Sequence, residues 1–162
     1  MKKMIRSLTA VIAVTILVSA CQSYDDISMV LGADVNTAKV ISKGDDHGGF
    51  HGDGERYIEF EFEDDTFEDT IKEDNTWHTL PVKDDTVTAL LYGLETPEMT
   101  YGPYLEHDIA KVEEGYYFFY DRHSESKDPF DTSEVLDRSS FNFTAAVYDA
   151  ETDKLYYTEL DT

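Results

Sequence analysis

Strict alternation of apolar and polar side chains between Arg56 and Glu63 constrains the fold of this chain more than any other feature. Ile58, Phe60 and Phe62 fall on one side of an extended segment, and acidic residues recur on the other. A period of two residues places successive side chains on opposite faces of a strand. The segment is therefore expected to be a half-buried β-strand with an acidic outer face.

Other segments carry weaker strand signals. The aromatic run Gly115–Asp121 is bulky enough for a central strand, and Thr37–Ser42 is a short strand candidate. The apolar segments Phe141–Tyr148 and Leu155–Leu160 bracket a six-residue polar turn. Two apolar segments around such a turn predict a β-hairpin at the C-terminal end of the sequence.

Helix and loop signals complete the pattern. Asp84–Tyr92 predicts a helix capped by an aspartate and ended by a glycine, and a shorter helix is expected from Asp25, capped by Asp25 or Asp26, to Gly32. Lys43–Glu55 is a glycine-rich polar loop in this interpretation, and Ser124–Asp137 is an exposed loop. Residues 25–162 are thus expected to form a single α+β domain, mainly an antiparallel sheet with a few short helices and a terminal hairpin.

Composition indicates that this domain is globular. Aromatic residues make up 13% of the chain, which is too many for a disordered acidic segment that cannot bury a core. Cys21 is the only cysteine, so an internal disulfide is excluded and the domain must fold on packing alone.

The first 21 residues resemble a bacterial lipoprotein export signal. Lys2, Lys3 and Arg6 precede an apolar run of 11 residues, Leu8–Val18, which is shorter than the roughly 18 that a membrane-spanning helix needs. Val18-Ser19-Ala20-Cys21 resembles the lipobox, although Val18 stands where the family most often has leucine. The resemblance implies a signal peptide at residues 1–20, a diacylglycerol on Cys21 and a short tether at residues 21–24. The expected location is the extracytoplasmic face of the cell membrane.

Removal of the signal would leave an extremely acidic domain. The remaining 142 residues hold 35 acidic side chains and ten lysines and arginines, for a net charge of −25. Such a charge repels nucleic acid and anionic lipid headgroups and leaves basic proteins, basic peptides or cations as partners. A well-solvated surface with no partner would have the same composition.

One loop carries residues suited to a divalent metal ion. Asp45, His47, His51 and Asp53 are ligand types for zinc or a similar ion, and the glycines between them would let the side chains converge. Two histidines four residues apart lie on one face of a helix, where they can bind a metal together. This segment is too rich in glycine for a helix, so the spacing alone does not indicate a metal site. A structural loop whose polar side chains hydrogen-bond to the backbone is the alternative.

A second candidate site follows the aromatic strand. Arg122 could hold a carboxylate or a phosphate, and His123 could transfer a proton. In so acidic a domain, an internal ion pair is the competing interpretation for Arg122.

No catalytic motif supports an enzyme. The sequence lacks the Gly-x-Ser-x-Gly, His-Glu-x-x-His, Ser-x-x-Lys and Walker patterns, and the lipid would occupy the only thiol. No cofactor is required by the residues present. A divalent metal stays the one cofactor that they suggest.

The mature region also resembles known proteins in three segments: His47–Gly54, Gly115–His123 and Tyr148–Thr162. These resemble small uncharacterised lipoproteins of Gram-positive bacteria, a group that brings no activity and no site residues with it. The expected function is a non-enzymatic binding domain anchored to the membrane. One specific form is an immunity or inhibitor protein against a basic toxin. The alternatives are a metal-dependent catalytic or sensing site and a structural envelope protein.

Overall fold

The computed structural model describes residues 23–48 and 52–162. Its main feature is a six-stranded antiparallel sheet with the strand order β1-β2-β8-β7-β6-β3, accompanied by a separate pair, β4 and β5. The elements are α1 (Asp25–Leu31), β1 (Lys39–Asp45), β2 (Gly54–Glu61), α2 (Thr66–Lys72), β3 (Trp77–Thr79), α3 (Asp85–Tyr92), β4 (Leu94–Glu95), β5 (Thr100–Tyr101), β6 (Gly115–Asp121), the 3₁₀ turn η1 (Val135–Asp137), β7 (Asn142–Asp149) and β8 (Lys154–Asp161).

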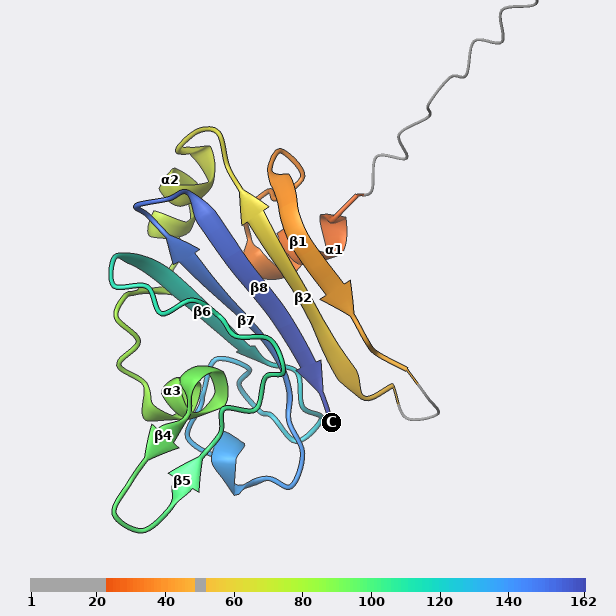
Figure 1. The fold of residues 1–162 in the computed structure, drawn as a ribbon, viewed down its shortest axis with the longest axis vertical. Coiled ribbons are helices and arrows are strands. Elements are labelled where there is room, and N and C mark those ends of the chain that lie inside the picture. The colour runs from red at the N-terminus through yellow and green to blue at the C-terminus, as the bar shows by residue number, and fades with distance from the viewer. Residues whose placement is uncertain (1–22, 49–51) are drawn as a thin grey trace, which may run out of the picture.

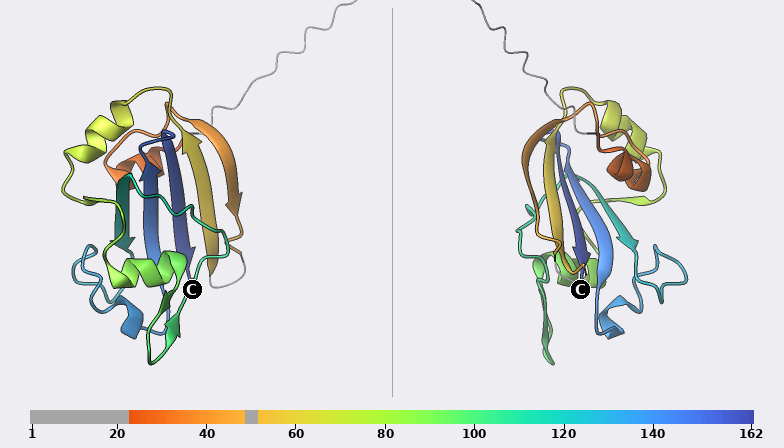
Figure 2. Two further views of the ribbon diagram at one scale, coloured as in Figure 1. Left: turned by 60° about the vertical axis from the view of Figure 1, so that its left-hand side comes forward. Right: turned by 90° about the vertical axis from the view of Figure 1, so that its right-hand side faces the viewer.

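Each face of the sheet is covered over part of its length (Figures 1 and 2). Helices α1 and α2 lie over one end of one face, whereas α3 and the β4–β5 pair lie near the other end on the opposite face. We call these the α1/α2 face and the α3 face. The segment of residues 104–112, which we call the strap, crosses the α3 face and buries Leu105 and Ile109 there.

Alternation along the central strands supplies two cores from one sheet. On β6, Phe118 packs on the α1/α2 side with Trp77 and Tyr148, while Phe119 packs on the α3 side with Phe143. Because successive side chains point to opposite faces, an unbroken aromatic run fits a strand that is covered on both sides.

The predicted fold class is confirmed, as are the main strands. The terminal hairpin pairs Asp149 with Lys154, and Ile58, Phe60 and Phe62 are all buried on one side as expected. The predicted loop at residues 43–55 was wrong at both ends, since residues 43–45 belong to β1 and residues 54–55 to β2. The ladder between these strands continues past Gly44, and Asp45 pairs with Arg56.

The predicted helices also form, with one difference in capping. The side chain of Asp84 accepts a hydrogen bond from Val87 N–H at the start of α3, and Gly32 ends α1 in the left-handed conformation. The expected aspartate cap of α1 was wrong: Tyr24 occupies that position and supplies no side-chain hydrogen bond. Tyr24 is 6% exposed and packs edge-on against Phe60, so this residue belongs to the packed domain.

Five elements had no sequence prediction: α2, β3, β4, β5 and η1. Helix α2 buries Phe67 and Ile71, and β3 adds Trp77 to the same core, where its indole N–H donates to the carbonyl of Leu31. In the part of the chain that the structure describes, no helix has the length and apolar character needed to cross a membrane.

Candidate functional site

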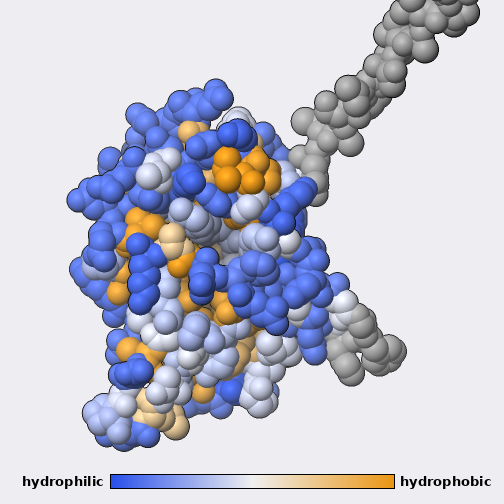
Figure 3. Space-filling view, in the orientation of Figure 1, coloured by the Kyte–Doolittle hydropathy of each residue, from blue (hydrophilic) through white to orange (hydrophobic). Residues whose placement is uncertain are grey.

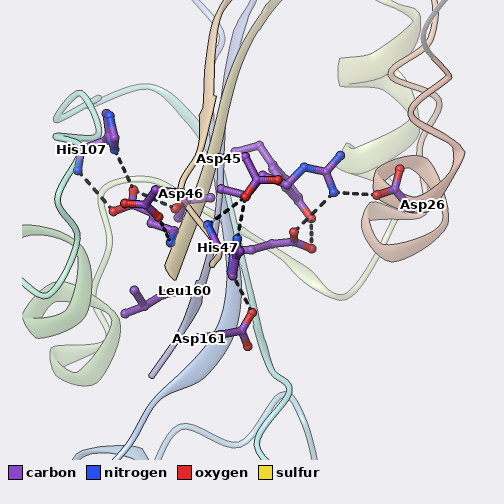
Figure 4. Close-up of polar contacts among 12 residues, drawn as sticks. Asp26, Asp45, Asp46, His47, His107, Leu160 and Asp161 are labelled. Atoms are coloured by element: carbon purple, nitrogen blue, oxygen red, sulfur yellow. Dashed lines mark hydrogen bonds and ion pairs between the residues drawn. The ribbon is translucent and has the colours of Figure 1, made fainter. Parts of the chain in front are cut away.

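Charged side chains gather on the α1/α2 face between helix α1 and the ends of β1 and β8 (Figure 4). We call this group the polar network; it comprises Asp26, Asp45, His47, Arg56, Arg122, Glu159 and Asp161. It brings together three of the residues singled out in the sequence, Asp45, His47 and Arg122. Asp161, near the end of β8, connects them.

His47 lies between two carboxylates. Its Nδ1 is 2.9 Å from Asp45 Oδ1, and its Nε2 is 3.1 Å from Asp161 Oδ2. Partial burial opposes protonation of the ring, but hydrogen bonds and charges from the two aspartates outweigh it and raise the pKa of His47 above its ordinary 6.5. The hydrogen bond from His47 is also the main cause that lowers the pKa of Asp45.

Arg122 holds the other side of Asp161. Its Nη1 lies 3.0 Å from Oδ1 and its Nη2 lies 3.1 Å from Oδ2, which makes a bidentate pair. The guanidinium also donates to Thr144 Oγ1 and to the carbonyl oxygens of Phe143 and Leu160. Arg122, which directly follows β6, thus joins β7 to β8, with its side chain 27% exposed.

A second branch of the network centres on Arg56. Its Nη1 lies 2.6 Å from Asp26 Oδ2 in α1 and 3.4 Å from Glu159 Oε2 in β8. Burial raises the pKa of Asp26, but the hydrogen bond and charge of Arg56 dominate and lower it overall. A recess of about 310 Å³ lies beside Arg56 and is also lined by Tyr24 and Lys43.

The contacts of His47 fit a structural role better than a catalytic one. A general base needs an acceptor atom within reach of substrate, and both ring nitrogens of His47 already face carboxylates. The contacts instead tie the segment after β1 to the end of β8. We interpret the polar network as a latch between these two parts of the chain.

The predicted metal site stays a prediction. His51 lies outside the described residues, and Asp53 is exposed. Among residues 23–48 and 52–162, no group of three or more histidine, cysteine, aspartate or glutamate side chains is placed to hold a metal ion.

His123 lies beside the network but takes no part in it. Its Nε2 is 3.2 Å from Ser140 Oγ, and its Nδ1 accepts a hydrogen bond from Glu125 N–H. The backbone N–H of His123 donates to the buried carboxylate of Asp121, which forms an ion pair with Arg138. These contacts order the loop after β6, and they do not join His123 to Arg122.

A second cluster, on the α3 face, was not predicted from the sequence. The side chain of Glu55 is only 1% exposed. Its Oε2 accepts hydrogen bonds from the N–H groups of Glu106 at 2.6 Å and His107 at 3.3 Å, and its Oε1 accepts one from Thr158 Oγ1 at 3.2 Å. His107 Nδ1 lies 3.6 Å from the same carboxyl group. Glu55 therefore fastens the strap to the sheet.

The ring of Tyr57 lies beside the carboxyl group of Glu55, in a space that is open because residue 44 is a glycine. The ring stacks on His107, with centroids 3.6 Å apart and planes inclined by 27°. A Cβ atom on Gly44, which pairs with Tyr57 across β1 and β2, would lie 2.3 Å from Cε1 of that ring. The aromatic side chain therefore covers the bare backbone of an edge-strand glycine.

The sequence held only a partial signal for this cluster. Glu55 directly precedes the alternating segment Arg56–Glu63 and has the parity of Tyr57 and Glu59, so its placement on the α3 face follows once β2 is extended to include it. Its burial depends on the strap, which folds over the sheet from about 50 residues away along the chain. Comparison with protein families, with curated proteins and with solved structures found no match to this chain.

Proposed function

We propose that this protein is a lipid-anchored, extracytoplasmic binding domain that recognises a basic protein or peptide and catalyses no reaction. The charge balance carries the proposal. Three arginines lie in the described part of the chain, and all three form ion pairs: Arg56, Arg122 and Arg138. With 35 acidic residues against ten lysines and arginines after Arg6, most carboxylates have no positive side chain to pair with. Cationic partners are therefore drawn to the domain over a wide surface.

The surface chemistry agrees with a polar partner. On the face shown in Figure 3, apolar patches are small and separated by hydrophilic surface. A large continuous apolar area is the usual mark of a hydrophobic docking site. Charge complementarity would instead provide attraction, specificity and a fast association rate on this face.

The short tether supports a position close to the membrane. Cys21 precedes the buried Tyr24 by three residues, which span at most about 10 Å when extended. A domain of charge −25 is repelled by anionic headgroups, so the acyl chains would be needed to keep it there. An immunity or inhibitor protein against a basic toxin is one form of this function.

Release from the membrane tests the anchor. The Cys21→Ala protein is expected in the soluble fraction, whereas the unaltered chain stays with membranes after a high-salt wash. Retention of the variant after the same wash would contradict the lipid-anchor interpretation.

Salt-dependent capture tests the partner. The full-length lipoprotein in detergent micelles is used to capture proteins from wall and membrane extracts, with a lipoprotein of equal negative charge as control. We expect a basic partner enriched over the control, whose affinity falls steeply between about 50 and 200 mM salt, because screening lengths shorten over this range. Equal recovery on both proteins would leave a structural envelope role as the better account.

A further inference from the structure

A pocket of about 150 Å³ opens on the α3 face beside the buried carboxyl group of Glu55. We call it the Glu55 pocket. The residues that its chemistry depends on are Tyr57, Glu59, His107, Asp108, Ile109 and Tyr156. They come from β2, from β8 and from the strap, so the pocket exists only when the strap lies on the sheet.

Two contacts fix its walls. Glu55 holds the strap by the backbone N–H groups of Glu106 and His107, whose positions do not depend on the side-chain rotamers of those two residues. Tyr57 is confined between Gly44 and the ring of His107. A pocket built in this way needs little ordering when a ligand enters, which lowers the entropic cost of binding.

The lining has two chemical characters. Tyr57, Tyr156 and Ile109 offer aromatic and aliphatic surface, while Glu59 and Asp108 add carboxyl groups beside the buried one. No lysine or arginine is among the residues that line this pocket, although Lys154 approaches Glu59 Oε1 at 2.8 Å. A ligand that fits must carry an apolar stem and a positive end, which is the character of a lysine side chain.

The volume sets the size of that ligand. The pocket has a volume of about 150 Å³. Small-molecule and cofactor sites usually need about 300–1,000 Å³. The end of one side chain therefore fits, and a nucleotide or a drug-sized molecule does not.

The hydrogen bonds already present favour an ammonium over a guanidinium. Glu59 Oε2 accepts from Ser42 Oγ at 3.3 Å and Oε1 accepts from Lys154, so each oxygen keeps a single lone pair for a further donor. Both oxygens of Glu55 are likewise engaged. Arginine gains most from a carboxylate with two open oxygens, whereas an ammonium can use single lone pairs from several groups.

We propose that the Glu55 pocket binds the ammonium end of a lysine side chain presented by the basic partner. The inference names the chemistry of the partner and rests on the proposed function for the source of that lysine. The methylenes pack against the three apolar walls, and the ammonium lies toward Asp108 and Glu59.

Titration with defined small probes tests the pocket without any partner. Nα-acetyl-lysine methylamide is titrated into the full-length lipoprotein in detergent micelles, and binding is followed by calorimetry or by amide chemical shifts. We expect binding near the millimolar range, as befits one side chain, with shifts centred on residues 57, 107–109 and 156. The acetyl-norleucine amide, which has the stem without the charge, should bind at least tenfold more weakly, and the arginine analogue several-fold more weakly.

A matched pair of charge variants keeps the test specific. Asp108→Asn is expected to weaken lysine binding about three- to tenfold, whereas Glu98→Gln, an exposed acid in the β4–β5 turn, should leave it unchanged. Equal losses in both variants, or equal binding of the norleucine probe, would overturn the inference. If the lysine probe does not bind while a basic partner is still captured, the inference about the pocket is wrong and the proposed function stands. Probe binding without any captured partner would support the pocket and contradict the proposed function.

Discussion

The polar network and the Glu55 pocket lie on opposite faces of the same strands, and they use carboxyl groups in different ways (Figure 4). In the network, each carboxylate faces a side-chain cation, and the pairs are part-exposed. The side chain of Asp161 is 23% exposed and that of Arg56 is 20% exposed. In the pocket, Glu55 is sealed from water, and backbone N–H groups are its main donors. The first arrangement joins side chains to one another, and the second joins a side chain to a segment of main chain.

The difference has an energetic consequence. A network partner that loses its ion pair can still turn toward water, so part-exposed pairs contribute modestly to stability. The backbone N–H groups that lose Glu55 cannot rotate toward a new partner as a side chain can. The hydroxyl of Thr158 is buried, and leaving it without its acceptor costs its desolvation penalty. Substitutions on the two faces should therefore differ in effect even though both remove one carboxyl contact.

Replacement of Glu55 should have the largest effect. Glu55→Ala leaves the N–H groups of Glu106 and His107 and the hydroxyl of Thr158 without their acceptor. We expect a loss of about 3 kcal/mol in the free energy of unfolding, measured by urea denaturation. Glu61→Ala, on the same strand but half exposed, is the control and should cost less than about 0.5 kcal/mol. Similar losses in the two variants would show that Glu55 does not fasten the strap.

Substitution of Gly44 should come next, because it displaces the ring that forms one wall of the pocket. Gly44→Ala puts a Cβ atom 2.3 Å from Tyr57 Cε1, so the ring or the edge strand must move. Overpacking of this kind costs about 1–3 kcal/mol, and the stack on His107 should be lost. Gly48→Ala is the matched control, since the nearest atom to its Cβ would be a carbonyl oxygen at 3.5 Å. Loss of the ring-current shift on the His107 protons, seen by NMR in the first variant only, would sharpen the contrast.

Removal of Arg122 should cost less than either change on the α3 face. Arg122→Met keeps much of the aliphatic stem but deletes the bidentate pair with Asp161. We expect a loss of about 1–2 kcal/mol, which should decrease at high salt because the pair is part-exposed. A double-mutant cycle with Asp161→Asn measures the coupling directly. A coupling energy near zero would show that the Arg122–Asp161 pair does not stabilise the latch.

The two faces also differ in how far the sequence predicted them. Short-range periodicity placed Ile58 and Phe60 in the core and singled out the strands that carry the polar network. Asp45 and His47 were recognised as candidates because they are metal-ligand types in a glycine-rich segment, and Arg122 because it follows the aromatic strand. Their meeting point, Asp161, had no distinguishing signal among 35 acids. Glu55 escaped prediction for a different reason: its burial comes from Glu106 and His107, which only tertiary folding brings near. Alternation predicts which face a side chain is on, and it does not predict what will cover that face.

The smallest expected effect is the pH dependence of the latch. Because the pKa of His47 is raised above 6.5 in the folded protein, its stabilising contribution is complete below that value and is lost as the pH rises through the folded-state pKa. The lowered pKa of Asp45 acts at the other end: its contribution is present above 3.8 and is lost as the pH falls through its folded-state value. His47→Gln should therefore destabilise the protein more at about pH 5.5 than at about pH 9, with the loss at the lower pH on the order of 1 kcal/mol. Unfolding curves at the two pH values decide the point, with His78→Gln as an exposed histidine control. An equal loss from His47→Gln at both pH values would mean that neutral hydrogen bonds, and not the charge on the ring, hold the latch.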